Sequence, residues 1–280
     1  MTATAATTAT HPGIEVRNLG FDVDAARVPR QWHPAGQTVT TFFDALSTFF
    51  PEGERFFIAS VLAHRDHVTD PALKEAVRAF CGQEGIHGRE HGRYNAMLVA
   101  HGYPADVLER EVKELLVRVK RRLPRRMRLA ATCALEHFTA LMAKGLLGDD
   151  RLLAGADPTM AALWRWHAAE ENEHKSVAYD VLLAARGTYF ERVAAMAGAT
   201  VIFWAKILEH QARMMRVDGT HRSPREWLRL AHFLFVSPGG LRRIVPDYLR
   251  YYVPGFHPRA IDSSALVEAW RSTLSSPAPS

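Results

Sequence analysis

The chain has 280 residues, a net charge of +5 and only two cysteines, Cys81 and Cys133. This length suffices for a substantial core, and two cysteines without CxxC spacing exclude a disulfide framework. With no signal-peptide pattern at the start, the cysteine usage predicts a cytoplasmic protein. The longest uncharged apolar run, Val193 to Ala205, is shorter than the roughly 20 residues that span a bilayer, so a transmembrane helix is not expected.

Helix signals follow one another along most of the chain. Asp70-Pro71 and Asp157-Pro158 each combine an N-cap aspartate with proline at the first helical position, and Gly187 is a stop signal. Strand signals are scarce, because no sustained period-2 alternation is bounded by turn dipeptides. Apolar periodicity and these signals predict an all-α fold with helices over residues 38–50, 52–68, 71–100, 105–122, 125–147, 158–186, 189–215 and 224–252.

The two ends of the chain lack comparable signals. Residues 1–37 are predicted to be disordered or extended, residues 38–258 to form one helical domain with a C-terminal helical extension, and residues 259–280 to be a tail. No internal repeat or linker separates a second domain. The apolar stretch from Leu228 to Val253, with interspersed arginines, could contact a membrane or a second subunit, and burial within the fold is the favoured alternative.

Carboxylates and imidazoles recur in the order E, ExxH, E, ExxH on four of the predicted helices. Positions i and i+3 of a helix share a face, so each ExxH can direct a carboxylate and an imidazole at one point. Ferritin-like di-iron and di-manganese bundles use this arrangement. We therefore expect a ferritin-like four-helix bundle with a di-metal core and additional C-terminal helices. The predicted ligands are Glu54, Glu84, His87, Glu136, Glu171 and His174.

Two further histidines, His91 and His167, lie seven residues from an ExxH residue and return to nearly the same helix face. Each is a candidate metal ligand, with hydrogen-bonded support of a ligand as the alternative. Gln83 and Glu170 directly precede the two ExxH glutamates, and they are expected to hydrogen-bond the free ring nitrogens of the ligand histidines.

Other residues around the ExxH motifs carry weaker signals. Glu90 and Glu173 are expected to face solvent. Gly85, Gly88 and Gly92 interrupt the first ExxH helix, and each costs about 0.5 to 1 kcal/mol relative to alanine. We interpret them as places where another helix or a substrate approaches the backbone closely.

The motifs FFPEGERFF, ALEHFTA, WRWHAAEENEHKSVAYDV and YYVPGFHP resemble those of a bacterial, ferritin-like family known as predicted metal-dependent hydrolases. The resemblance extends from about Val39 to Pro258. It implies a di-metal carboxylate site in a soluble bacterial protein, and it leaves the substrate open. Arg259 follows PGFHP where the family pattern would have an aromatic residue, so no role is assigned to His257.

The leading hypothesis is an enzyme in which two iron ions activate O2 to oxidise or oxygenate an organic substrate, with manganese or a mixed iron–manganese pair as alternative metals. The alternative reaction is hydrolysis by a metal-bridging hydroxide, and iron oxidation or storage is a third function.

The expected partners are a small-molecule substrate and an electron-donor protein, and a peripheral membrane contact or a homodimer would also be compatible. No nucleic-acid partner is expected, because the arginine cluster near residue 120 is interpreted as a solvated helix end.

Overall fold

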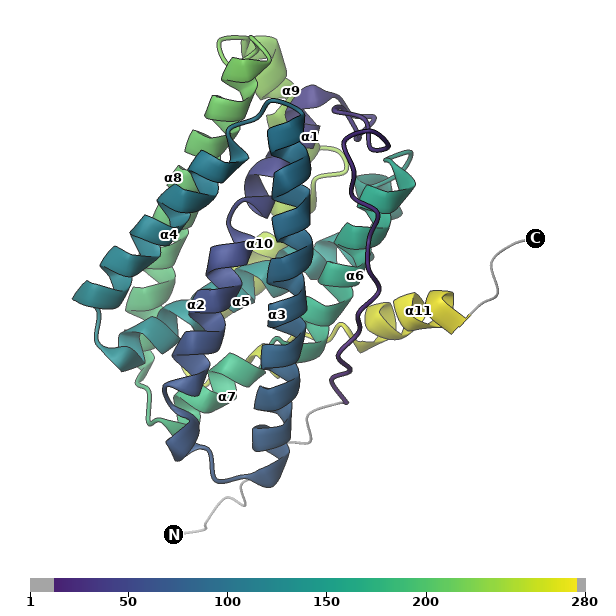
Figure 1. Ribbon diagram of the computed structural model, residues 1–280. Helices are drawn as coiled ribbons and strands as arrows, with labels where there is room; N and C mark the ends of the chain where they lie inside the picture. The colour runs from purple at the N-terminus through teal and green to yellow at the C-terminus, as the bar shows by residue number, and fades with distance from the viewer. Residues whose placement is uncertain (1–12, 276–280) are drawn as a thin grey trace.

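The computed structural model describes residues 13–275, and within this range every regular element is a helix, which confirms the all-α prediction (Figure 1). Three of the elements are short 3-10 helices, Arg65–His67, Asp150–Leu152 and Pro258–Ala260. The α-helices are α1 (Gln37–Ser47), α2 (Phe50–Leu62), α3 (Pro71–Ala100), α4 (Ala105–Arg122), α5 (Arg125–Leu147), α6 (Pro158–His174), α7 (Val177–Ala184), α8 (Tyr189–Val217), α9 (Pro224–Phe235), α10 (Gly240–Arg250) and α11 (Ser264–Ser275).

Four helices, α2, α3, α5 and α6, form the centre of the molecule. Helix α2 packs along α3, α5 packs along α6, and α2 also contacts α5. The two helices with an ExxH motif begin as expected, because Asp70 accepts a hydrogen bond from the backbone of Ala72, and Asp157 accepts from Thr159 and Met160. The specific likeness to ferritin stays a prediction.

Two predicted helices are each divided in the structure. The segment predicted over residues 158–186 breaks at Lys175 and Ser176, where α6 ends and α7 begins. The segment predicted over residues 224–252 breaks at Pro238 and Gly239 between α9 and α10. Proline has no N–H for the helix ladder, and Gly239 adopts a left-handed φ of 74° that favours glycine.

The C-terminal helices are only half-covered by the rest of the chain. On α9 and α10, Leu230, Phe233 and Ile244 face the core, whereas Leu228 and Leu249 are exposed. The stretch thus packs against its own fold on one face, and its outer face is exposed; contact with a membrane or a second subunit stays a prediction. Helix α11 lies within the segment predicted as a tail, yet it packs against α6 and buries Trp270.

Helix α8 is long and apolar enough to cross a membrane by length and composition. Its most apolar 18-residue window has a mean hydropathy of 1.2, and 22% of that window is buried. One such helix is weak support for a membrane span, because core helices and signal sequences can meet the same criterion. In this fold α8 packs along α1 and α5.

A buried aspartate lies beside the four-helix centre. The Asp44 carboxylate accepts hydrogen bonds from the Trp32 indole (3.0 Å) and from the Tyr94 hydroxyl (2.7 Å), both at Oδ1. Its Oδ2 atom has no hydrogen-bond partner among residues 13–275. Burial raises the pKa of Asp44 to about 7, although both hydrogen bonds act to lower it.

The raised pKa of Asp44 makes stability depend on pH. Between about pH 4 and pH 7 the Asp44 carboxyl is protonated in the folded chain and ionised in the unfolded chain. Rising pH therefore favours the unfolded chain, and stability falls over this range. Asparagine does not ionise, so the variant Asp44→Asn lacks this loss of stability. We predict that the difference in unfolding free energy, variant minus wild type, rises by up to about 3 kcal/mol between pH 5 and pH 8. Urea titrations at both values measure this, with the exposed Asp66→Asn as control, and an unchanged difference would contradict it.

Candidate metal centre

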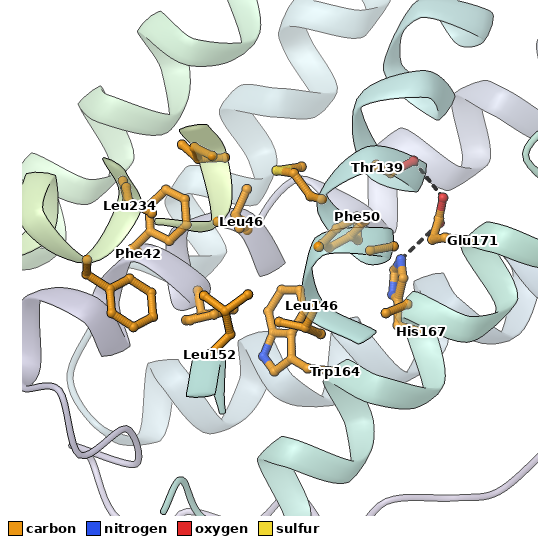
Figure 2. Close-up of a pocket in the computed structure, with 18 residues that line it drawn as sticks. Phe42, Leu46, Phe50, Thr139, Leu146, Leu152, Trp164, His167, Glu171 and Leu234 are labelled. Atoms are coloured by element: carbon orange, nitrogen blue, oxygen red, sulfur yellow. Dashed lines mark hydrogen bonds and ion pairs between the residues drawn. The ribbon is translucent and has the colours of Figure 1, made fainter. Parts of the chain in front are cut away.

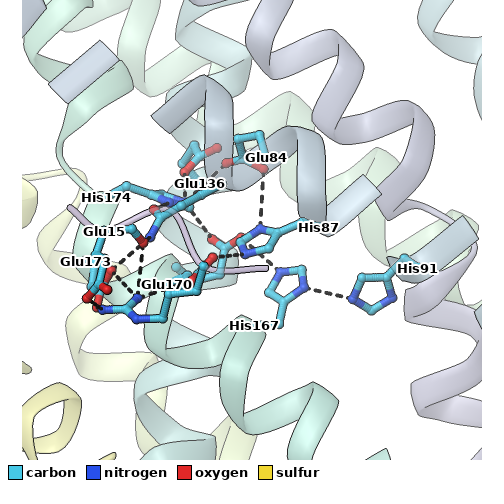
Figure 3. Close-up of polar contacts among 12 residues, drawn as sticks. Glu15, Glu84, His87, His91, Glu136, His167, Glu170, Glu173 and His174 are labelled. Atoms are coloured by element: carbon cyan, nitrogen blue, oxygen red, sulfur yellow. Dashed lines mark hydrogen bonds and ion pairs between the residues drawn. The ribbon is translucent and has the colours of Figure 1, made fainter. Parts of the chain in front are cut away.

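The six predicted ligands meet inside the four-helix centre, and Figure 3 shows four of them, Glu84, His87, Glu136 and His174. Helices α2 and α5 contribute one glutamate each, and α3 and α6 contribute an ExxH pair each. All six side chains are buried, with exposed fractions of 2% or less, at Glu54, Glu84, His87, Glu136, Glu171 and His174. Residues up to 120 positions apart in the sequence therefore share one enclosed polar site.

Histidine nitrogens lie close to carboxylate oxygens in the site. His174 Nε2 lies 3.2 Å from Glu84 Oε1 and 3.5 Å from Glu136 Oε2, and His87 Nδ1 lies 3.7 Å from Glu171 Oε1. Ligand atoms within 4.8 Å of one another form two sets, one from Glu54, His87, His167 and Glu171 and one from Glu84, Glu171 and His174. Both sets contain Glu171, and each could hold a metal ion.

The atoms that point into the site lack hydrogen-bond partners among the described residues. Both carboxylate oxygens of Glu54, Glu84 and Glu136 are buried and unpaired, as are His87 Nδ1 and His174 Nε2. Unpaired buried polar atoms are costly and therefore rare. Nitrogen and oxygen donors of this kind fit iron, manganese or zinc. The residues present thus fit a metal-binding site.

The pKa values of the buried carboxyl groups indicate that the site needs positive charge to keep all of them ionised. Burial, together with the charge of Glu84, raises the pKa of Glu54 and Glu136 well above the ordinary carboxyl value. Burial acts in the same direction on Glu84, but the contacts of Glu84 with Glu54 and His174 outweigh it and lower the pKa of Glu84 well below the ordinary carboxyl value.

The pKa values of the two ExxH histidines are raised, although burial alone would lower them. Burial alone would lower the pKa of His87, but its contacts with Glu170 and Glu84 raise it to about 9. His174 is raised well above its ordinary pKa by Glu84 and Glu171, again against burial. Without another cation, these imidazoles take up protons and supply the positive charge that the ionised carboxylates require.

The outer ring nitrogens of these histidines are held as the sequence predicts. His174 Nδ1 is 2.8 Å from Gln83 Oε1, and His87 Nε2 is 3.1 Å from Glu170 Oε2. Gln83 Nε2 in turn donates to Glu173 Oε2, which fixes the amide with its oxygen toward His174. Each inner ring nitrogen is thereby directed at the centre of the site.

The expectation that Glu90 and Glu173 face solvent is wrong. Both are buried, because the N-terminal segment from residue 13 lies across α3 and α6 and covers them. Arg17 from this segment donates to Glu173 at 2.8 and 2.9 Å and to Glu170 at 3.2 Å. The backbone of Phe21 donates to Glu90. Arg17 is a site residue that the sequence does not predict, because its segment has no helical periodicity that would indicate its place.

The glycine interpretation also needs correction. An added Cβ at Gly85 or Gly92 would meet no atom within 4 Å, and at Gly88 the nearest atoms of α2 lie at an ordinary 3.7 Å. The close approach occurs instead at Gly82, where a Cβ would lie 2.8 Å from the side chain of Val16. Gly82 thus leaves room for the segment that carries Arg17.

His91 lies outside both sets of ligand atoms and supports His167. Its Nδ1 bonds Ser47 Oγ (2.9 Å) and its Nε2 bonds His167 Nδ1 (2.8 Å). Ser47 donates onward to Asn95 Oδ1, whose amide nitrogen donates to Glu109. This direction of donation makes His91 Nδ1 a donor and His91 Nε2 an acceptor.

The same chain of hydrogen bonds determines the state of His167. Its Nδ1 is the donor to His91, and burial with the nearby His87 lowers its pKa, so its Nε2 carries a lone pair. That lone pair lies 3.0 Å from Glu171 Oε1. With Glu171 ionised, the two atoms are both acceptors and repel each other unless a cation lies beside them, which favours His167 as a further ligand and His91 as its support.

An apolar pocket adjoins one side of the site (Figure 2). Its volume is about 80 Å³, and its walls include Phe42, Leu146 and Trp164. His167, Glu171 and Thr139 are the polar groups at its inner end. The Thr139 hydroxyl donates to Glu171 Oε2 at 2.6 Å. Thr139 was not among the predicted site residues, although its position three residues after Glu136 places it on the same helix face. The site is thus open to a small apolar group.

The comparison with protein families agrees with this geometry. The family model described as "Predicted metal-dependent hydrolase" matches residues 15–262, which is most of the chain. The chain belongs to this family. The match confirms the resemblance noted in the motifs, and it supports the hydrolytic alternative better than oxygen activation. Comparisons with curated proteins and with solved structures find no match.

We predict that Glu84→Gln and His174→Ala each lose at least one metal ion per chain, because each removes an unpaired ligand atom. Elemental analysis after reconstitution measures this, and chelation should also lower the melting temperature of wild type. The control for Glu84→Gln is Glu75→Gln, a change at an exposed glutamate of the same helix, α3. Full metal content in both ligand variants would refute the assignment.

We predict that Gln83→Leu weakens metal binding by about 10- to 100-fold, because His174 Nδ1 loses its acceptor. Competition with a coloured chelator measures the affinity, and circular dichroism checks that the fold persists. Glu75→Gln again serves as control. An unchanged affinity in Gln83→Leu would show that His174 needs no support.

Proposed function

We propose that this protein is a metal-dependent hydrolase of a small molecule with an apolar part. The observation that carries the proposal is the set of unpaired ligand atoms beside an apolar pocket. The family description supports hydrolysis as the reaction. Glu84, Glu171 and His174 would hold one metal ion, and Glu54, His87, His167 and Glu171 the other, with Glu136 beside the first.

When bound, two cations would supply Lewis acidity and lower the pKa of a bound water. The chain itself contributes position and exclusion of solvent. Thr139 holds one oxygen of Glu171, and Arg17 holds Glu170 behind His87. The apolar walls around Phe50 and Trp164 would orient the apolar part of the substrate and keep bulk water out.

A second candidate is oxygen activation by two iron ions for oxidation or oxygenation of an organic substrate. Its supporting observation is the donor set, which consists of carboxylates and imidazoles without a thiolate and suits iron or manganese. Apolar pocket walls would also protect a reactive oxidant from quenching. This reaction would need reducing equivalents, and hence an electron-donor protein.

One experiment separates the two reactions. The protein is reconstituted with zinc, manganese or iron and incubated with a series of aryl esters of increasing acyl length, in water labelled with ¹⁸O and with O2 uptake recorded. We predict ester cleavage with label from water in the acid product and no O2 uptake. Cleavage should fall to background in Glu84→Gln and persist in Glu75→Gln. O2 uptake by the reduced iron form, with oxidised product and no cleavage, would establish the second candidate instead.

A further inference from the structure

A second apolar groove runs between α4 and α8, over α2 and α5. It has a volume of about 330 Å³, within the range of small-molecule sites. Its lining side chains are aliphatic or aromatic, apart from glycines and Thr139. Gly198 of α8 lies at its rim and is exposed. A groove of this size with Thr139 as its one polar lining side chain is suited to a hydrocarbon.

The groove runs along helix α5. Met127, Ala131, Leu135 and Thr139 line it at intervals of four residues, so they lie on one face of the helix. Twelve residues at 1.5 Å each give a length of about 18 Å. The inner end is Thr139, which also lines the first pocket and donates to Glu171. The groove therefore leads to the candidate metal centre.

The outer end of the groove lies at the corner between α4 and α5, where Leu123 and Met127 line it. This corner is rich in positive charge, with basic residues at Lys120, Arg121, Arg122, Arg125, Arg126 and Arg128. Arg126 pairs with Glu191, whereas Lys120, Arg121 and Arg122 form no ion pair with the acidic residues of the described chain. Arg128 Nε is buried without a hydrogen-bond partner there.

We propose that this groove binds a long-chain fatty carboxylate, with its head at the basic corner and its hydrocarbon chain extending toward Thr139. A single chain fits the observations best, because the groove is long, lined by four helices and charged at its outer end. A membrane or a second copy of the protein would instead cover the outward face of α8, where Phe190 and Val201 are exposed. The inference concerns binding, and so it is independent of the reaction at the metal centre.

The test uses the delipidated full-length protein and measures palmitate binding by calorimetry. A Cβ atom at position 198 would have no other heavy atom within 4 Å, so a larger side chain has room there and can fill the groove. Gly198→Phe should therefore weaken binding by about tenfold or more. Ala197→Phe, on the exposed neighbouring position outside the groove, is the matched control and should bind as wild type. Arg122→Glu should weaken binding of palmitate and leave binding of the uncharged alcohol of equal length unchanged.

Several outcomes would overturn the proposal. Absence of palmitate binding would do so directly, as would equal losses in Gly198→Phe and Ala197→Phe. Binding that appears only with vesicles and is unaffected by Gly198→Phe would assign the apolar surface to a membrane. A dimer of wild type that dissociates in Gly198→Phe, without fatty acid bound, would assign it to a second copy.

Discussion

The structure depends on one electrostatic constraint, which is that carboxylates buried together need positive charge among them. Four glutamates meet inside the helical core with exposed fractions of 2% or less, and water cannot screen their repulsion. The chain supplies part of the compensation through His87 and His174, whose pKa values are raised. The inner ring nitrogens of both histidines nevertheless make no hydrogen bond within the described residues. A pair of metal cations would satisfy the same atoms.

The layers around this centre follow from the same requirement. Arg17 balances Glu170 and Glu173, and Arg271 of α11 adds a second guanidinium on Glu173. Segments from both ends of the chain thus complete the polar shell, and Gly82 leaves space for one of them. On the opposite side, the chain of hydrogen bonds from Asn95 to His167 directs a lone pair inward. Both apolar pockets approach the centre at Thr139, and the first also reaches His167 and Glu171.

The features that the sequence predicts well are those set by helical periodicity and by helix-capping residues. The ExxH spacing predicts which faces of α3 and α6 point inward, and the Asp-Pro caps predict where both helices begin. Arg17 could not be predicted, because its segment is extended and its contacts lie more than 150 residues away. For the same reason Glu173 was misassigned to solvent. The break at Pro238 has a local signal in the sequence, because the Pro-Gly-Gly run is typical of a turn.

The most direct test of the account is the position of the metal ions in crystals of the reconstituted protein, measured by anomalous diffraction at the metal's absorption edge. The account predicts two peaks, one among Glu84, Glu171 and His174 and one among Glu54, His87, His167 and Glu171. Peaks elsewhere on the molecule, or fully loaded crystals without a peak between these side chains, would contradict it.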